Sequence, residues 1–172
     1  MKRKLVTAGI ILVCFLLNSS IFSYLKIGQI TPNIMVVVTA SFGFMRGKKE
    51  GLLVGFFSGL LIDFYSGGIL GSYALLYSIL GYLNGLFQRL FYDEDIKLPL
   101  ALIASSELIY GLAVFIFSFV MRSRFHFGNY LIGIIIPELL YTVLITFFLY
   151  PVILMINRQL EEKEKRSASK FV

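Results

Sequence analysis

Three carboxylates lie inside apolar stretches of this 172-residue chain, and their types and positions point to chemistry. Asp63 ends one apolar run, Glu107 lies near the middle of another, and Glu138 follows Pro137 in a third. A carboxylate at the centre of a bilayer costs about 2.5 to 3.5 kcal/mol on insertion scales, so Glu107 must face a protein interior, be protonated or be hydrogen-bonded. Asn84 and nearby tyrosines are candidate partners. Asp63, Asn84, Glu107 and Glu138 are therefore the candidate buried or functional polar residues.

Each carboxylate has a structural and a functional interpretation. Asp63 leads into a glycine-rich turn, where its oxygens can accept bonds from the backbone amides of Gly67 and Gly68 or contact a ligand or partner. For Glu107 the two interpretations stay open. For Glu138 the structural one is favoured, because Pro137 removes a backbone donor and invites a kink beside it.

Catalytic and metal sites are hard to assemble from this composition. A Ser-His dyad requires the only histidine, His126, which falls in a connection between apolar segments. One His and one Cys, Cys14, cannot build a tetrahedral metal site, and there is no Walker-type phosphate loop. The sequence therefore predicts a protein that is not an enzyme and uses no metal or cofactor.

Glycines recur at a spacing of four residues in two of the apolar segments. They are Gly51, Gly55 and Gly59 in the third segment, and Gly81 and Gly85 in the fourth. Residues four apart lie on one face of a helix, and small residues there let helix backbones approach closely in lipid. The third segment is expected to be a central packing helix with the fourth as its neighbour. Intramolecular contact is favoured over contact with another chain, but both stay open.

The elements that position these residues are six apolar segments, at 5–24, 27–45, 51–66, 69–91, 98–121 and 130–156. Most match or exceed the roughly 20 residues that a helix needs to cross a hydrocarbon core. With 58% hydrophobic and 15% charged residues, the chain has too little polar surface for a soluble domain. The predicted fold is all-α, an integral membrane bundle of about six transmembrane helices in one domain. That domain covers residues 1–157, and a charged tail covers 158–172.

Thirteen of the sixteen Lys and Arg residues fall on one side of this arrangement. They are Lys2, Arg3, Lys4, Arg46, Lys48, Lys49, Arg89, Lys97, Arg158, Lys163, Lys165, Arg166 and Lys170. The positive-inside rule places that side in the cytoplasm, which predicts a multi-pass plasma-membrane protein with both termini cytoplasmic. The net charge of +6 then favours anionic lipid headgroups, and a nucleic-acid partner is unnecessary.

One alternative topology concerns the short third segment, 51–66. The sequence RGKKEG at 46–51 leaves very little connection before it, so the segment could be re-entrant, or the second and third segments could form one broken helix. Either arrangement sends one terminus outside. The five basic residues of the C-terminal tail argue against this, because they would then lie on the external face.

Five motifs occur in order along the chain: TPN at 31–33, RGKKEG at 46–51, GFFSGLLIDFYSGGILGSYAL at 55–75, GYLNG at 81–85 and PELLY at 137–141. Their order resembles the rod shape-determining protein MreD family, over about residues 5–157. The stretch from Arg46 through Gly71 is the most specific part. This chain has Thr142 where relatives commonly have Asn.

The resemblance implies a component of the bacterial cell-elongation machinery in the plasma membrane. Its implied partners are the bitopic protein MreC, the actin-like protein MreB, and the peptidoglycan synthases RodA and penicillin-binding protein 2. It also implies a helical fold similar to the substrate-binding subunits of energy-coupling-factor transporters.

Two functions follow as hypotheses. The first is a membrane scaffold that binds partner helices in a groove around the third and fourth segments. There Gly55 and Gly59 provide close approach, Asp63 fixes the external turn and Glu107 is a buried polar anchor. The alternative is a transporter subunit that binds a small, vitamin-like molecule near the external face, and it is motivated by the polar residues in an apolar bundle.

Overall fold

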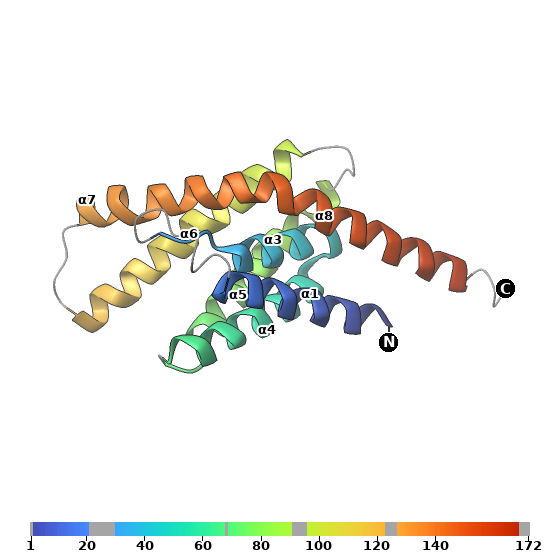
Figure 1. Ribbon diagram of the computed structural model, residues 1–172, viewed down its shortest axis with the longest axis horizontal. Coiled ribbons are helices and arrows are strands. Elements are labelled where there is room, and N and C mark those ends of the chain that lie inside the picture. Colours follow the sequence, from blue (N-terminus) through green and yellow to red (C-terminus); the bar gives the residue numbers. More distant parts are fainter. Residues whose placement is uncertain (1, 21–29, 68, 91–95, 123–126, 169–172) are drawn as a thin grey trace.

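The computed structural model describes residues 2–20, 30–67, 69–90, 96–122 and 127–168, and every long element in them is a helix (Figure 1). The elements are α1 (Lys2–Ser19), α3 (Ile34–Arg46), α4 (Lys48–Ser66), α5 (Ser72–Leu86), η1 (Phe87–Leu90), α6 (Lys97–Arg122), α7 (Phe127–Tyr130), η2 (Leu131–Ile135) and α8 (Ile136–Ala168). The all-α prediction is confirmed for these residues, and each predicted apolar segment contains a helix.

The long helices run back and forth along one axis of the bundle. Figure 1 shows the start of α1, the end of α8 and the α3–α4 connection at one end, whereas the α4–α5 turn, the end of α6 and α7 lie toward the other. Helix α8 continues without a break to Ala168, so the tail predicted from residue 158 is helical over its described part.

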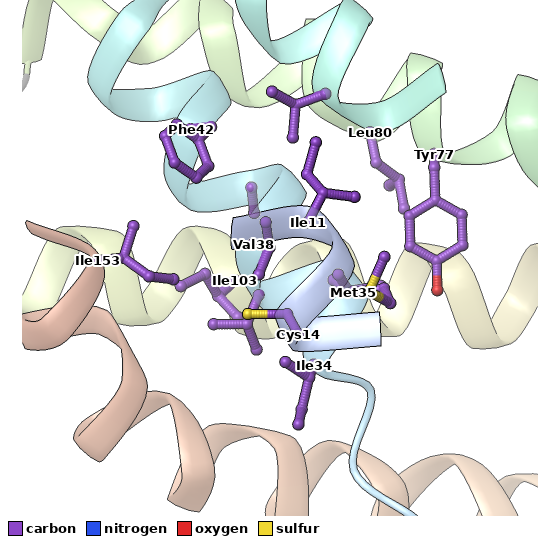
Figure 2. Close-up of a cluster of buried hydrophobic side chains, with 14 of the residues drawn as sticks. Ile11, Cys14, Ile34, Met35, Val38, Phe42, Tyr77, Leu80, Ile103 and Ile153 are labelled. Carbon is purple, nitrogen blue, oxygen red and sulfur yellow. The ribbon is translucent and has the colours of Figure 1, made fainter. Parts of the chain in front are cut away.

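Helix α3 lies at the centre of the bundle. All twelve of its residues from Ile34 to Met45 are buried, whereas α4 buries only one face. Figure 2 shows Ile34, Met35, Val38 and Phe42 of α3 among Ile11 and Cys14 of α1, Tyr77 and Leu80 of α5, Ile103 of α6 and Ile153 of α8. The expectation that the third segment is central is therefore wrong. A helix that is apolar on all sides belongs in a core, and that pattern marks α3.

Helix α3 is also too short to cross a bilayer by itself. Its 13 residues span about 20 Å, less than a hydrocarbon core about 30 Å thick. Helix α3 begins at Ile34 because Asn33 caps it, so the segment predicted from residue 27 is longer than the helix. Residues 27–29 lie outside the described part of the chain.

A single residue, Gly47, separates α3 from α4. Its φ of 91° and ψ of −179° lie in a region that only glycine adopts readily, and this lets the two helices fold back into contact with each other. The structure therefore has two separate helices here, and not the single broken helix across 46–51 that was the alternative.

Glycines bring the backbones of α4 and α5 into direct contact. A Cβ atom added at Gly55 would overlap the backbone of Tyr77, and one added at either Gly51 or Gly81 would overlap the backbone of the other. The five predicted glycines all lie at this contact: Gly51, Gly55 and Gly59 on α4, and Gly81 and Gly85 on α5. Because α5 of the same chain covers the glycine face, the groove predicted for a partner helix is closed.

Helices α6 and α8 are the longest apolar helices and expose much of their surface. Two stretches, Lys97–Phe117 and Leu131–Lys163, are long and apolar enough to cross a membrane, and 22% of each is buried inside the structure. Their exposed residues include Leu108, Ile116, Phe117, Leu144 and Phe148. Water-soluble proteins rarely expose apolar surface of this extent, whereas lipid covers it readily.

The predicted kink at Pro137 takes the form of one π-helical turn. The amide of Ile136 donates to the carbonyl of Leu131, five residues back. In a regular α-helix the ring of Pro137 would clash with the carbonyl of Gly133. The wider turn η2 accommodates the proline, so that α7, η2 and α8 follow one another without an intervening loop.

Replacing Gly55 with Leu is expected to lower the thermal unfolding temperature of the purified protein in detergent. The added side chain would overlap backbone atoms of Tyr77, which cannot rotate away, and overpacking of this kind costs about 3 kcal/mol. Gly9→Leu is the matched control, because a Cβ at Gly9 has nothing within 4 Å. Equal unfolding temperatures for the two variants would contradict the close approach of α4 and α5.

Candidate functional site

A polar cluster at one end of the bundle is centred on Arg46, the last residue of α3. The Arg46 side chain is 2% exposed. Its Nε donates to Asn157 Oδ1 at 2.6 Å, and its Nη1 donates to Thr7 Oγ1 at 2.9 Å and to Glu50 Oε2 at 3.3 Å. The guanidinium also lies 4.7 Å from the ring centre of Phe42. Three directed bonds from one planar cation thus tie α3 to α1, α4 and α8.

The Arg46 cluster extends through two acidic residues. Glu50 also forms an ion pair with Arg3 of α1, and Asn157 donates to Glu161 Oε1 at 3.0 Å. Buried charge is favourable only when paired and hydrogen-bonded, and this network meets both conditions for Arg46. The cluster therefore closes the end of the bundle where α1 begins and α8 leaves.

Asp63 caps the start of α5 from the end of α4. Its carboxylate accepts bonds from the amides of Gly71, Tyr73 and Ala74 at 3.0 to 3.1 Å, and from the Ser72 hydroxyl at 3.3 Å. These are the amides that a helix N-terminus leaves without partners, and the helix dipole favours a negative charge there. The described bonds of the Asp63 carboxylate run to Gly71 and the first turn of α5, whereas the amide of Gly67 donates to the Asp63 main-chain carbonyl. Gly68 lies outside the described residues.

The N-terminal end of α3 has its own polar cluster around Asn33. The Asn33 Oδ1 accepts from the amide of Val36 at 3.3 Å and from the Tyr77 hydroxyl at 2.8 Å. The Asn33 amide donates to the Thr142 hydroxyl oxygen at 3.0 Å, and Asn18 Oδ1 accepts from the next amide along the chain at 3.4 Å. Thr142 thus supplies the acceptor for a buried backbone donor.

Asn84 does not contact either glutamate. Its amide nitrogen donates to Ser106 Oγ at 2.7 Å and to the Leu80 carbonyl at 2.8 Å. The bond to Ser106 joins α5 to α6, and the Asn84 residue is 3% exposed. The prediction that Asn84 is buried holds, and its partner is the residue adjacent to Glu107.

Glu107 and Glu138 lie on facing helices, α6 and α8, close enough for their charges to interact. Glu107 is 2% exposed, and neither carboxylate oxygen makes a hydrogen bond to a described residue, although the Thr142 side chain is a polar neighbour. Glu138 lines a cavity. Burial of Glu107 in a protein interior agrees with the sequence prediction.

The cavity lies where six elements meet around the Asn33 cluster, and its volume is about 230 Å³. Its lining residues are Phe15, Asn18, Ser19, Thr31, Pro32, Asn33, Ile62, Tyr65, Tyr77, Tyr110 and Glu138. They come from α1, the α3 entry, α4, α5, α6 and α8. A half-polar cavity in an apolar bundle is a place for a small ligand.

A second, larger hollow of about 530 Å³ is an apolar groove between α1 and α4. Its walls include Ala8, Ile11, Leu12, Leu53, Val54, Phe57, Leu60 and Leu61, with Arg3, Lys4, Thr7 and Glu50 at one end. Unlike the glycine face of α4, no other helix of the described chain fills this groove.

Within the described residues no group of three His, Cys, Asp or Glu side chains could hold a metal ion. Cys14 is buried without a disulfide, and His126 lies outside the described residues. The polar clusters hold helices together, and they place no activated nucleophile beside a base.

Sequence reasoning missed the structural roles of Arg46, Glu50, Asn157 and Asn33. Two signals were present. Asn33 directly precedes an apolar run, as an N-cap residue does, and Arg46 and Glu50 are four residues apart in opposite charge. Asn157, which bonds Arg46 across 111 residues of chain, gave no local signal.

A family model described as rod shape-determining protein MreD matches residues 2–160. No curated protein and no solved structure matches the chain. The expected likeness to substrate-binding subunits of energy-coupling-factor transporters therefore stays a prediction.

Arg46→Lys is expected to destabilise the protein by about 2 kcal/mol, seen as a lower thermal unfolding temperature in detergent. Lysine keeps the positive charge but loses the planar fork that bonds Asn157, Thr7 and Glu50 together. Lys49→Ala serves as the control because Lys49 is exposed in the first turn of α4, three residues after Arg46. An unfolding temperature for Arg46→Lys that matches the control would show that charge alone, and not the bonding network, is needed.

Proposed function

Because this chain belongs to the MreD family of rod shape-determining proteins, we propose that it is a non-enzymatic scaffold of the cell-elongation machinery in the bacterial plasma membrane. The family places the chain in rod shape determination and in the membrane. The proposal adds that it organises peptidoglycan synthesis by packing against the transmembrane helix of an MreC-like bitopic protein. RodA, penicillin-binding protein 2 and MreB are further proposed members of the same assembly.

The observation that carries the proposal is the open apolar groove between α1 and α4. A scaffold in lipid needs a surface that fits another helix, since apolar character alone does not distinguish a partner from lipid tails. Small residues flank this groove: Ala8 is exposed, and Gly9 beside it has nothing within 4 Å of an added Cβ. A single helix of the partner therefore has both room and a shaped surface.

The polar end of the groove suits a helix that leaves the membrane there. Arg3, Lys4 and Glu50 surround that end. A bitopic partner commonly carries charged residues where its helix meets the interface, and the exposed Lys4 lies there beside the Arg3–Glu50 ion pair. The groove thus replaces the glycine face of α4 as the proposed docking surface.

The proposed orientation places the Arg46 end of the bundle in the cytoplasm. The described ends of α1 and α8 lie there with the α3–α4 connection, and these segments hold most of the thirteen basic residues counted from the sequence.

Ala8→Trp is expected to abolish co-purification of the MreC-like protein and to fail to restore rod shape in cells that lack the native protein. The indole would fill the groove from its α1 wall. Leu144→Trp is the matched control, because Leu144 is 57% exposed on α8 and does not line the groove. Both variants must show wild-type thermal unfolding. Normal partner binding by Ala8→Trp would overturn the groove as the docking surface.

A reporter enzyme that is active only outside the cytoplasm is expected to be inactive when fused after Val172 and active when inserted at Gly71, in the α4–α5 turn. A fluorescent protein that folds only in the cytoplasm should show the reverse pattern. The same side for both positions would contradict the proposed multi-pass orientation.

A second function, a small-molecule-binding subunit of a transporter, is supported by the cavity of about 230 Å³ beside Glu138. Association of the purified protein with an ATPase module would favour it. Association with the bitopic protein alone would favour the scaffold.

A further inference from the structure

The cavity beside Glu138 has a lining that selects for one kind of ligand. Four of its described lining residues are aromatic: Phe15, Tyr65, Tyr77 and Tyr110. Two further polar neighbours on its wall, Asn18 and Asn33, already accept hydrogen bonds from the protein. The side-chain oxygens of both asparagines are thus engaged, and the aromatic rings form a further part of the wall that a ligand can contact.

The rings form adjacent walls and not a stack. Phe15 and Tyr65 have ring centres 5.9 Å apart with planes at 86°, and Tyr77 and Tyr110 have centres 5.5 Å apart with planes at 61°. All four rings line the cavity, and ammonium groups are commonly bound in sites lined by several aromatic rings. The negative face of an aromatic ring attracts a cation placed within about 6 Å of its centre.

The charges around the cavity have one sign. Glu138 lines it, and Glu107 lies behind it, near enough to Tyr77 and Tyr110 for electrostatic interaction with both. No Lys or Arg is among the described lining residues. Glu107 is 2% exposed, with both carboxylate oxygens without a hydrogen bond among described residues. Glu107 has the Thr142 side chain beside it, so Glu138 is the acid that a ligand in the cavity would meet directly.

We propose that this cavity binds an organic ammonium group, with Glu138 as its counter-ion and the aromatic residues as its walls. Among the described lining residues, the one ionisable group that carries a full charge is the Glu138 carboxylate, which favours a cation over an anion. A metal ion would need a cluster of ligating side chains, and the described residues contain none. The inference goes beyond the scaffold function and holds whether or not the bundle binds a partner helix.

An ammonium group can reach the cavity from two sources. One is a small soluble amine, and the other is the ethanolamine headgroup of a phospholipid. The shared chemistry is a cation carried on a compact apolar group, so the experiment has one arm for each source.

In the first arm, the full chain is placed in nanodiscs of phosphatidylglycerol and titrated with choline or ethanolamine by calorimetry. The neutral isostere 3,3-dimethylbutanol has the shape of choline without its charge. It is expected to bind about tenfold more weakly or not at all, since ring and carboxylate attraction both require the charge. Equal binding of choline and the isostere would overturn the proposal.

In the second arm, the thermal unfolding temperature is compared in nanodiscs with and without phosphatidylethanolamine. A rise with this lipid that disappears in Glu138→Gln would assign the headgroup as the source and support the proposal. No response to soluble amines and none to the lipid would refute it. The co-purification experiment with the bitopic protein does not depend on this outcome, so the two proposals fail separately.

Two variants distinguish a loss of ammonium binding from a loss of overall stability. Glu138→Gln keeps size and hydrogen bonding but removes the charge, and it should weaken ammonium binding about tenfold. Tyr110→Phe keeps the ring and removes only the hydroxyl, so it should bind within about threefold of wild type. Unliganded unfolding temperatures check that both variants fold. Unchanged binding by Glu138→Gln, or loss of binding by Tyr110→Phe, would contradict the assigned roles.

Discussion

The rest of the structure depends on how both ends of α3 are satisfied without water. This helix is buried along its length, so the unpaired backbone groups and polar side chains at its ends need partners inside the protein. At its start, the backbone amides of Asn33 and Ile34 donate to side chains of α8 and α1. At its end, Arg46 donates to side chains of the same two helices. The first and last long helices therefore clamp the central one at two points about 20 Å apart along its axis. This explains why buried polar side chains of α1 and α8, such as Thr7, Thr142 and Asn157, lie at the ends of α3.

The clamp leaves α4 and α5 to be joined by other means, and the glycine contact and Asp63 supply them. Glycines bring the two backbones together, and the Asp63 carboxylate then lies where it can cap α5. The use of one face of α4 for this contact leaves another part of its surface uncovered. Because α4 uses its glycine face inside the chain, its opposite flank is left open beside α1 as the groove. The cavity arises at the other end, where α3 starts late and the surrounding helices extend beyond it.

Much of this arrangement could be predicted from the sequence, and what was missed shares one physical cause. Apolar run lengths predicted the helices, and four-residue spacing placed the glycines on one face. Spacing along a helix defines a face but does not say which helix covers it. Contact between the third and fourth segments was favoured and is confirmed. The scaffold hypothesis also placed a partner helix around these glycines, where α5 leaves no room. For the same reason Asn84 was expected to meet a glutamate and instead bonds Ser106. Bonds between residues far apart in the chain, such as Arg46 to Asn157, follow from the packing and have no local signature.

The π turn at η2 sets the phase of α8. One extra residue in a turn rotates everything before it by about 100° relative to the helix that follows. Removing one residue from 131–135 would therefore leave Glu138 and Thr142 in place but rotate α7 about the helix axis. The chain that enters α7 from α6 would then have to follow a different path. The sequence PELLY thus begins one residue beyond Ile136, the residue whose amide closes the π turn, and Pro137 favours keeping this wider turn because its ring would clash with a regular α-helical turn.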